Sequence, residues 1–224
     1  GSAGPPGVPV AGPGVAAGST GGAAGSAFWG FGSARGGAGR ATRGNGGTQS
    51  EARSIPLDPV DAPALAVWAE QNGIDLAVCG PESALAEGIA DLFTRRGIPL
   101  FGPSRGAAQI ETSKAYAKDL MRRAEVPTAR FGAFTDYDLA AAFIRERGAP
   151  IVVKASGLAA GKGAVVCETV EEALDHARAM LAGESFGAAG SEIVVEEFLR
   201  GEELSVFALT DGTDVMVLLP AQDH

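Results

Sequence analysis

The sequence has no excess of basic residues. Its 224 residues include 18 Lys and Arg against 27 Asp and Glu, which gives a formal net charge of −9 at pH 7. Nucleic acids and anionic membrane surfaces are polyanions, and proteins that bind them present a basic surface. The sequence also lacks the run of about 18 apolar residues that a membrane-spanning helix needs. These absences predict a protein that binds neither nucleic acid nor membrane.

Cysteine is nearly absent, since Cys79 and Cys167 stand far apart and outside any C-x-x-C pair. They make neither a disulfide framework nor a zinc site, and they fit a reducing compartment. The sequence also shows no basic segment followed by an apolar one near its start, which is the pattern of a secretory signal. We therefore expect a soluble cytoplasmic protein.

Residues 1–43 lack acidic residues and lysine and are dominated by glycine, alanine, proline and serine. Of the 33 glycines in the chain, 17 lie within residues 1–47. A segment with so few large apolar side chains does not offset the entropy that it loses on ordering. We expect residues 1–43 to be a disordered, low-complexity tail. Translation of a GC-rich gene in a shifted reading frame would also produce such a segment.

From residue 54 onward, patterns of strands and helices alternate. Strand, helix and strand at this spacing predict a parallel crossover unit, and so an α/β fold class. The expected elements, in chain order, are a helix opened by Asp61 and closed by Gly73, a strand at 74–79, a helix at 84–96 and a strand at 98–101.

A second region begins at residue 104. We expect its first helix, at 104–124, to break near Thr112 and Ser113, where a side-chain oxygen can cap the next helix. Thr169 and Glu172 form the pattern of a capping box and predict a helix that starts there. The other expected elements are a helix at 136–147 and strands at 131–134, 151–155, 164–167, 193–198, 203–210 and 215–219.

A glycine-rich loop follows the expected strand at 151–155. It differs from a Walker A loop, because the spacing is one residue short and a strand follows it instead of a helix. Gly157, Gly161 and Gly163 would let backbone amides approach phosphate oxygens closely. Lys162 would add a charge at the tip. The alternative is a surface hairpin whose lysines are merely solvated.

Lys154 lies inside the apolar strand that precedes this loop. An ammonium group without a partner is costly to bury, and a triphosphate is a partner that would offset this cost. The position of Lys154 therefore favours the phosphate-binding interpretation of the loop.

Acidic residues mark the end of a later strand, at Glu196 and Glu197, and Glu203 follows Leu199 by four residues. A strand end offers backbone donors and acceptors that can read the edge of an adenine ring. An acid one turn later can accept hydrogen bonds from ribose hydroxyls. The alternative is an ordinary solvated strand edge.

In combination these residues resemble an ATP-grasp ligase, through Lys114 near a helix start, Lys154, the glycine-rich loop and the Glu-x-x-Leu-x-x-x-Glu pattern that begins at Glu196. The chain is most similar to the phosphoribosylamine–glycine ligase (glycinamide ribonucleotide synthetase) family, over about residues 44–224. The stretches that carry this similarity are residues 78–82, 101–103, 108–114, 154–163 and 222–224.

The resemblance implies a partial Rossmann-like N-terminal substrate domain at residues 44–103. An incomplete ATP-grasp domain follows at residues 104–224, with a flap subdomain at about 127–190. The resemblance also implies that ATP is bound by Lys114, Lys154, Gly157, Gly161, Lys162, Gly163, Glu196, Glu197, Leu199 and Glu203. It implies a substrate site formed by Gly80, Pro81, Glu82, Asp223 and His224.

Within the implied ATP site, Lys114 and Lys154 would contact the phosphates. Backbone groups of Glu197 and Leu199 would hold adenine, and Glu203 would bind ribose. The implied reaction phosphorylates the carboxylate of glycine with ATP. The amine of 5-phosphoribosylamine then attacks the acyl phosphate, giving glycinamide ribonucleotide, ADP and phosphate. Mg²⁺ or Mn²⁺ would bridge phosphate oxygens, and the enzyme would be a monomer.

The sequence departs from the family pattern at both ends. The Gly-Gly-Arg-Glu-His turn that binds the substrate phosphate in the family is missing from residues 1–43, and the acidic and amide ligands of the metal would lie beyond His224. We therefore expect no turnover from this chain. The alternatives are another ATP-grasp ligase that joins a carboxylate to an amine, and a nucleotide-binding remnant without catalysis.

Overall fold

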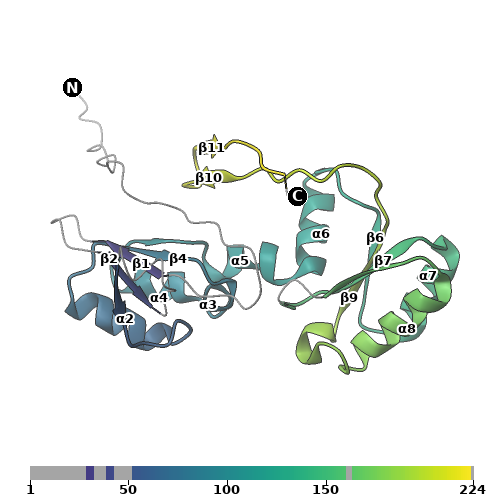
Figure 1. Ribbon diagram of the computed structural model, residues 1–224, viewed down its shortest axis with the longest axis horizontal. Coiled ribbons are helices and arrows are strands. Elements are labelled where there is room, and N and C mark those ends of the chain that lie inside the picture. Colours follow the sequence, from purple (N-terminus) through teal and green to yellow (C-terminus); the bar gives the residue numbers. More distant parts are fainter. Residues whose placement is uncertain (1–28, 33–38, 43–51, 160–162, 223–224) are drawn as a thin grey trace.

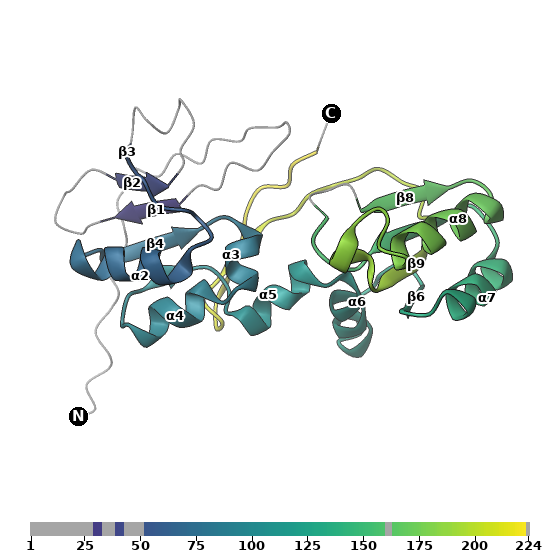
Figure 2. The ribbon, with the colours of Figure 1, turned by 90° about the horizontal axis from the view of Figure 1, so that it is seen from below.

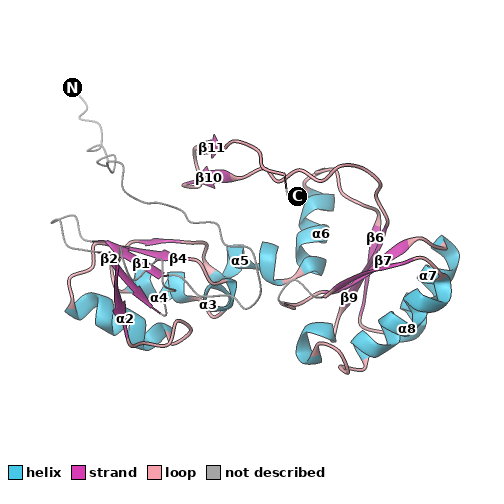
Figure 3. Cartoon of the chain, viewed as in Figure 1, coloured by secondary structure: helices cyan, strands magenta, loops and turns pink. Residues whose placement is uncertain are grey.

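The computed structural model describes residues 29–32, 39–42, 52–159 and 163–222. They form two lobes that lie side by side, with helix α5 (Arg105–Thr112) between them, and a separate small hairpin (Figures 1 and 2). Each lobe combines a sheet with helices (Figure 3). The α/β fold class expected from the sequence is confirmed.

The first lobe is built on a five-stranded sheet in the order β3-β2-β1-β4-β5. β4 and β5 are parallel, and helices α3 (Glu82–Ala86) and α4 (Ile89–Arg95) connect them, so the expected parallel crossover is confirmed. The core lies between this sheet and the helices, where Leu65 of α2 (Ala62–Gln71) and Phe93 are fully buried. The strands are β1 Trp29–Gly32, β2 Gly39–Thr42, β3 Ala52–Ile55, β4 Leu76–Cys79 and β5 Leu100–Phe101.

β1 and β2 lie within the stretch that the composition predicts to be disordered, so this prediction is wrong for both segments. β1 runs antiparallel to β4, from Trp29 opposite Cys79 to Gly32 opposite Leu76. Ala41 of β2 is almost completely buried. Every residue except proline brings a backbone donor and acceptor, so a glycine-rich segment can still pair when a partner strand is present. Composition does not reveal that partner.

The helices of the first lobe follow their capping residues. Asp61 caps α2, where its Oδ1 accepts a hydrogen bond of 3.0 Å from the backbone of Ala64. The single helix expected at 84–96 is instead two helices. Gly88 separates them with a φ of 84°, a left-handed conformation that ends helical geometry.

The expected break between α5 and α6 (Lys114–Arg123) is confirmed. Ser113 has extended backbone angles, φ −137° and ψ 109°, and its Oγ accepts a hydrogen bond of 3.2 Å from the backbone of Tyr116. Ala108 of α5 is part of the core of the first lobe, whereas α6 packs beside strand β9 (Ile193–Glu197) of the second lobe. The two helices therefore belong to different lobes.

The second lobe contains a four-stranded antiparallel sheet in the order β6-β9-β7-β8. Its other strands are β6 Phe131–Phe134, β7 Ile151–Ala155 and β8 Ala164–Cys167, and η1 (Gly187–Gly190) precedes β9. Helices α7 (Tyr137–Arg147) and α8 (Val170–Leu181) cover one face of this sheet and bury Val153 and Val195 against it (Figure 1). The capping box predicted at Thr169 and Glu172 is present at the start of α8.

The hairpin of β10 (Ala208–Thr210) and β11 (Val215–Val217) has shorter strands than the sequence predicts. Val215, Met216 and Val217 are all more than 60% exposed, so neither side of this hairpin packs into a core of the described residues. Among the helices of the described residues, none is long and apolar enough to cross a membrane.

Candidate functional site

The start of α6 is attached to the end of β7. Lys114 begins α6, and its backbone N–H donates to the carbonyl of Ser156 at 2.8 Å. Its Nζ donates to the carbonyl of Gly157 at 3.2 Å. The structure therefore places Lys114 at the base of the glycine-rich loop, beside the strand that carries Lys154.

Ser156 is the junction of this region, and the sequence analysis did not identify it as a site residue. It is only 3% exposed. Its Oγ donates to Glu192 Oε2 at 2.8 Å and accepts from the backbone of Ala115 at 3.1 Å. A serine within a glycine-rich loop gives no sequence signal of such a role, because its partners come from two other segments.

The glycines of the loop have a steric reason at its two ends. A Cβ at Gly157 would lie 2.8 Å from the Cα of Ala189, and the Gly157 N–H donates to the carbonyl of Ala189 at 3.0 Å. At the other end, a Cβ at Gly163 would lie 2.5 Å from the Cβ of Ala159, and the carbonyl of Gly163 accepts from the backbone of Ala155 at 2.7 Å. Gly161 and Lys162, which the sequence analysis assigns to the same loop, lie outside the described residues.

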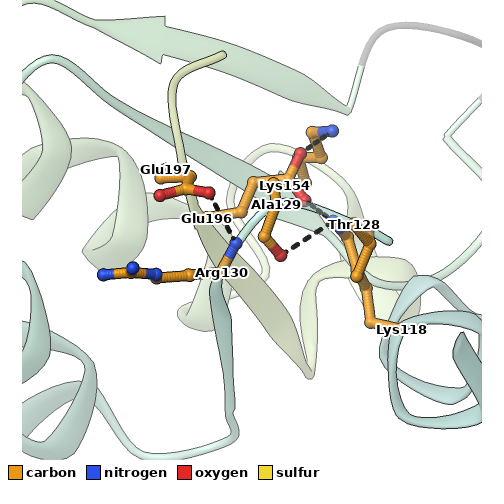
Figure 4. A network of polar contacts seen from close by, with 7 residues as sticks. All are labelled: Lys118, Thr128, Ala129, Arg130, Lys154, Glu196 and Glu197. Carbon is orange, nitrogen blue, oxygen red and sulfur yellow. Dashed lines mark hydrogen bonds and ion pairs between the residues drawn. The ribbon is translucent and has the colours of Figure 1, made fainter. Parts of the chain in front are cut away.

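Lys154 has a protein partner that the sequence analysis did not consider. Its Nζ forms an ion pair with Glu196 Oε1 (Figure 4). β7 and β9 are antiparallel neighbours, and Lys154 and Glu196 lie on the same face of the sheet, diagonally across the two strands. The sequence predicted both residues for the site but did not predict that they pair.

Glu196 is 4% exposed and therefore needs compensation for its buried charge. Lys118, one turn after Lys114 on α6, supplies a second cation, with its Nζ 2.5 Å from Glu196 Oε2 (Figure 4). The Lys118 Nζ also donates to Thr128 Oγ1 at 2.8 Å and to the carbonyl of Ala129 at 3.5 Å. The sequence analysis did not find Lys118. Its spacing of four residues from Lys114 was the only available signal.

Lys114 lies close enough to Lys154 for their charges to interact. Burial lowers the pKa of Lys114 from its usual value of 10.5, and the positive charge of Lys154 lowers it further, while Glu111 acts in the opposite direction. Burial is the largest of the three causes and disfavours the charged form of Lys114, Glu111 offsets part of this effect, and Lys154 contributes least. Lys114 and Lys154 therefore place two ammonium groups near each other at this end of the loop.

The end of β9 holds the other predicted nucleotide residues. The backbone N–H of Glu197 donates to the carbonyl of Arg130 at 2.9 Å, and its Oε1 accepts from the Arg130 N–H at 3.1 Å (Figure 4). These two hydrogen bonds join the end of β9 to Arg130, which precedes β6. The residues that follow, from Leu199 to Glu203, are exposed.

The predicted substrate residues lie in the first lobe, where β4 ends and α3 begins. Gly80 and Glu82 are exposed, and Pro81 between them is buried. The carbonyl of Pro81 accepts from the thiol of Cys79 at 3.6 Å, and burial raises the pKa of this thiol to about 12. Asp223 and His224 lie outside the described residues.

A metal site does not fit the part of the chain that the structure describes. Within residues 29–32, 39–42, 52–159 and 163–222, no group of three His, Cys, Asp or Glu side chains could hold a metal ion. The described residues instead bring lysine side chains to the base of the glycine-rich loop.

Two family profiles match the chain. The ATP-grasp (A) domain of phosphoribosylglycinamide synthetase matches residues 112–224, and the N domain of the same enzyme matches residues 39–111. The two matches meet inside α5. The N-domain match begins at residue 39, the first residue of β2, and so before the start at about residue 44 that the resemblance suggested.

Curated relatives are similar over most of the chain. The phosphoribosylamine–glycine ligase of Vibrio cholerae serotype O1 is 49% identical over 183 residues, which are 81% of this chain and 43% of the relative. The enzyme of the same description from Pseudomonas putida is 50% identical over 81% of this chain and 42% of its own length. The chain thus spans less than half the length of these relatives.

Solved structures of ligases are similar in fold. The phosphoribosylamine–glycine ligase of Thermotoga maritima superposes with a TM-score of 0.65 at 28% identity, over 79% of this chain and 42% of that structure. The biotin carboxylase domain of the 2-oxoglutarate carboxylase from Hydrogenobacter thermophilus, solved in complex with ADP and magnesium, has a TM-score of 0.62 at 26% identity. It covers 75% of this chain and 39% of that structure.

Proposed function

Because the chain belongs to the phosphoribosylglycinamide synthetase family, we propose that its second lobe binds ATP for the ligation of glycine to 5-phosphoribosylamine. The observation that carries this proposal is the meeting of Lys114 and Lys154 at the base of the glycine-rich loop. Two lysines whose charges repel each other, next to a loop that admits close backbone approach, form a site suited to a triphosphate.

In the proposed complex, Lys114 and Lys154 bind the phosphates of ATP. Backbone groups of Glu197 and Leu199 hold the adenine ring where β9 ends, and Glu203 accepts from the ribose hydroxyls. Glu196, which forms an ion pair with Lys154, belongs to the same proposed site. The loop from residue 157 to 163, with Gly157, Gly161, Lys162 and Gly163, covers the phosphates.

The proposed reaction proceeds in two steps. A carboxylate oxygen of glycine attacks the γ-phosphorus of ATP, forming glycyl phosphate and releasing ADP. The amine of 5-phosphoribosylamine then attacks the acyl carbon and expels phosphate, which gives glycinamide ribonucleotide. Lysines that neutralise the phosphates lower the barrier to the first step by stabilising charge and fixing geometry. No protein nucleophile takes part.

The substrates are proposed from the family, since glycine and phosphoribosylamine are named in the relatives that share about half of their aligned residues with this chain. Gly80, Pro81 and Glu82, with Asp223 and His224, are the proposed substrate contacts. A divalent cation, Mg²⁺ or Mn²⁺, belongs to the proposed reaction. The described residues supply no ligand set for it, so none of the steps above is assigned to the metal.

The proposed enzyme is a monomer that acts in the cytoplasm. Cys79 and Cys167 are both free and buried, which fits a reducing compartment.

Calorimetric titration of the full chain with ATP tests the nucleotide site. We expect Lys154→Ala to weaken ATP binding by tenfold to a hundredfold, because a hydrogen bond to a charged group contributes about 1.5–3 kcal/mol. Arg123→Ala is the matched control, because it removes one positive charge from an exposed position at the end of α6. Equal affinity of Lys154→Ala and the parent chain for ATP would contradict the proposed site.

A further inference from the structure

We propose that Lys118 is a positioning residue of the nucleotide site: it holds Glu196 in place, so that Lys154 can leave Glu196 and bind a phosphate. This inference rests on the proposed function, because it concerns the same ATP site. It assigns different tasks to two lysines that contact the two oxygens of the same carboxylate, Lys118 from α6 and Lys154 from β7.

Protein oxygens already surround the ammonium group of Lys118. A lysine ammonium has three N–H donors. Three oxygens surround the Lys118 Nζ, namely Glu196 Oε2 at 2.5 Å, Thr128 Oγ1 at 2.8 Å and the carbonyl of Ala129 at 3.5 Å. The Lys118 side chain is 12% exposed, and its ammonium also lies 5.7 Å from the centre of the Phe131 ring. Lys118 is therefore fixed within the protein.

Lys154 has fewer protein contacts than Lys118, and its side chain is more exposed. Its side chain is 29% exposed, and Glu196 is the only residue of the described part with which it forms an ion pair. An ammonium with one protein partner keeps two donors for other acceptors. Of the two lysines, only Lys154 can turn toward a phosphate without losing several protein contacts.

The buried charge of Glu196 explains why both lysines are needed. If Lys154 were its only partner, moving Lys154 to a phosphate would leave a buried carboxylate unpaired, which is strongly unfavourable. Lys118 remains at Oε2 when Lys154 leaves Oε1, so Glu196 stays compensated. Lys118 thereby reduces the competition between Glu196 and ATP for Lys154.

The position of Lys118 on α6 fits this task. Lys114 and Lys118 are four residues apart, so they lie on the same face of the helix and one turn from each other. The first turn of α6 thus carries a proposed phosphate ligand and the second turn carries the residue that anchors Glu196. A single helix positions both.

A double-mutant cycle tests the inference, with ATP affinity measured by calorimetry on the full chain. Lys118→Met keeps the length of the side chain but removes its charge, and Glu196→Gln removes the charge that Lys118 compensates. We expect Lys118→Met to weaken ATP binding about tenfold in the parent background, in line with hydrogen bonds to charged groups. In the Glu196→Gln background, we expect Lys118→Met to change the affinity by less than about twofold, because no buried carboxylate then competes for Lys154.

Two further variants complete the design. Arg123→Met removes an exposed charge from the same helix and is expected to leave ATP affinity within about twofold of the parent, because exposed charges are screened. Thr128→Val removes one acceptor of Lys118 without changing charge. It is expected to weaken ATP binding in the same direction by a smaller factor, and this effect too should vanish in the Glu196→Gln background. Thr128→Val therefore tests the positioning role of Lys118 even if Lys118→Met does not fold.

The outcomes separate this inference from the proposed function. ATP affinity unchanged by Lys118→Met, or a loss that persists in the Glu196→Gln background, overturns the positioning role. If Lys154→Ala still weakens ATP binding in that case, the proposed nucleotide site stands. Failure of the parent chain to bind ATP overturns both proposals.

Discussion

The two faces of the four-stranded sheet in the second lobe are formed by the same strands but carry opposite chemistry. On one face, Val153 and Val195 are buried under α7 and α8. On the other, their neighbours Lys154 and Glu196 form an ion pair. Side chains alternate between the faces of a strand. The register of β7 and β9 therefore places the ion pair on the face opposite to the apolar core under α7 and α8, beside the buried Val152 and Val194.

Truncating a large side chain on the apolar face should lower the free energy of unfolding more than any other substitution considered. Ile193 of β9 is fully buried against this core. We expect Ile193→Ala to lower the free energy of unfolding by about 2–5 kcal/mol, because it removes buried apolar surface and leaves a cavity. Urea denaturation measures this change. Ile193→Val is the matched control and should lower it by about 0.5–1.5 kcal/mol. A loss below that range for Ile193→Ala would mean that this face is not the main core of the lobe.

Substitutions on the charged face should lower the free energy of unfolding by less, and those at Lys118 and Lys154 should do so by different amounts. We expect Lys118→Met to lower the free energy of unfolding by about 1–3 kcal/mol, because it removes one partner of the buried Glu196 carboxylate. Lys154→Met should lower it by less than about 1 kcal/mol, since the Lys154 side chain is 29% exposed and Lys118 still compensates Glu196. The same urea titrations test this order. A reversed order would show that Lys154 is the structural partner of Glu196.

The smallest effect should be a dependence on pH from Lys114. Burial and the charge of Lys154 lower its pKa in the folded protein below 10.5. Between the lowered pKa and 10.5 the unfolded chain binds more protons than the folded one, so the free energy of unfolding should rise with pH in this window. Below the window, the penalty for the charged form is fully present.

Lys114→Met isolates this contribution. Urea denaturation of the parent and of Lys114→Met over a series of pH values up to 10.5 should show that the parent gains stability relative to the variant as pH rises. If the free energies of unfolding of the parent and of Lys114→Met change with pH in the same way over the whole range, Lys114 does not have a lowered pKa in the folded protein.

Local signals in the sequence predicted the second lobe well. The capping box at Thr169 and the serine cap at Ser113 depend on residues three positions apart, so they can be read without knowing the fold. The strands β6 to β9 were visible as runs of β-branched and aromatic residues. The glycine-rich loop and Lys154 were predicted as site residues from the same short stretch.

Features that depend on distant partners could not be predicted. β1 and β2 exist because β4 and β3 offer free strand edges to a glycine-rich segment whose composition suggests disorder. Lys118 looked like an ordinary helix lysine until β9 placed Glu196 beside it. The role of Ser156 likewise depends on Glu192, which lies 36 residues later in the sequence. In each case the partner is set by tertiary register, which short-range patterns do not contain.

Ser113 is the single residue that separates helix α5 from helix α6. The helical ladder stops there, since the first amides of α6 bond to Ser156 and to the Ser113 hydroxyl instead of to the carbonyls of α5. A rotation about the backbone of this one extended residue would change the angle between α5 and α6 without breaking a hydrogen bond inside either helix. Ser113 is therefore the point between the lobes where a change of backbone angle would disturb the two helices least, and Lys114, on its second-lobe side, is bonded to Ser156 and Gly157.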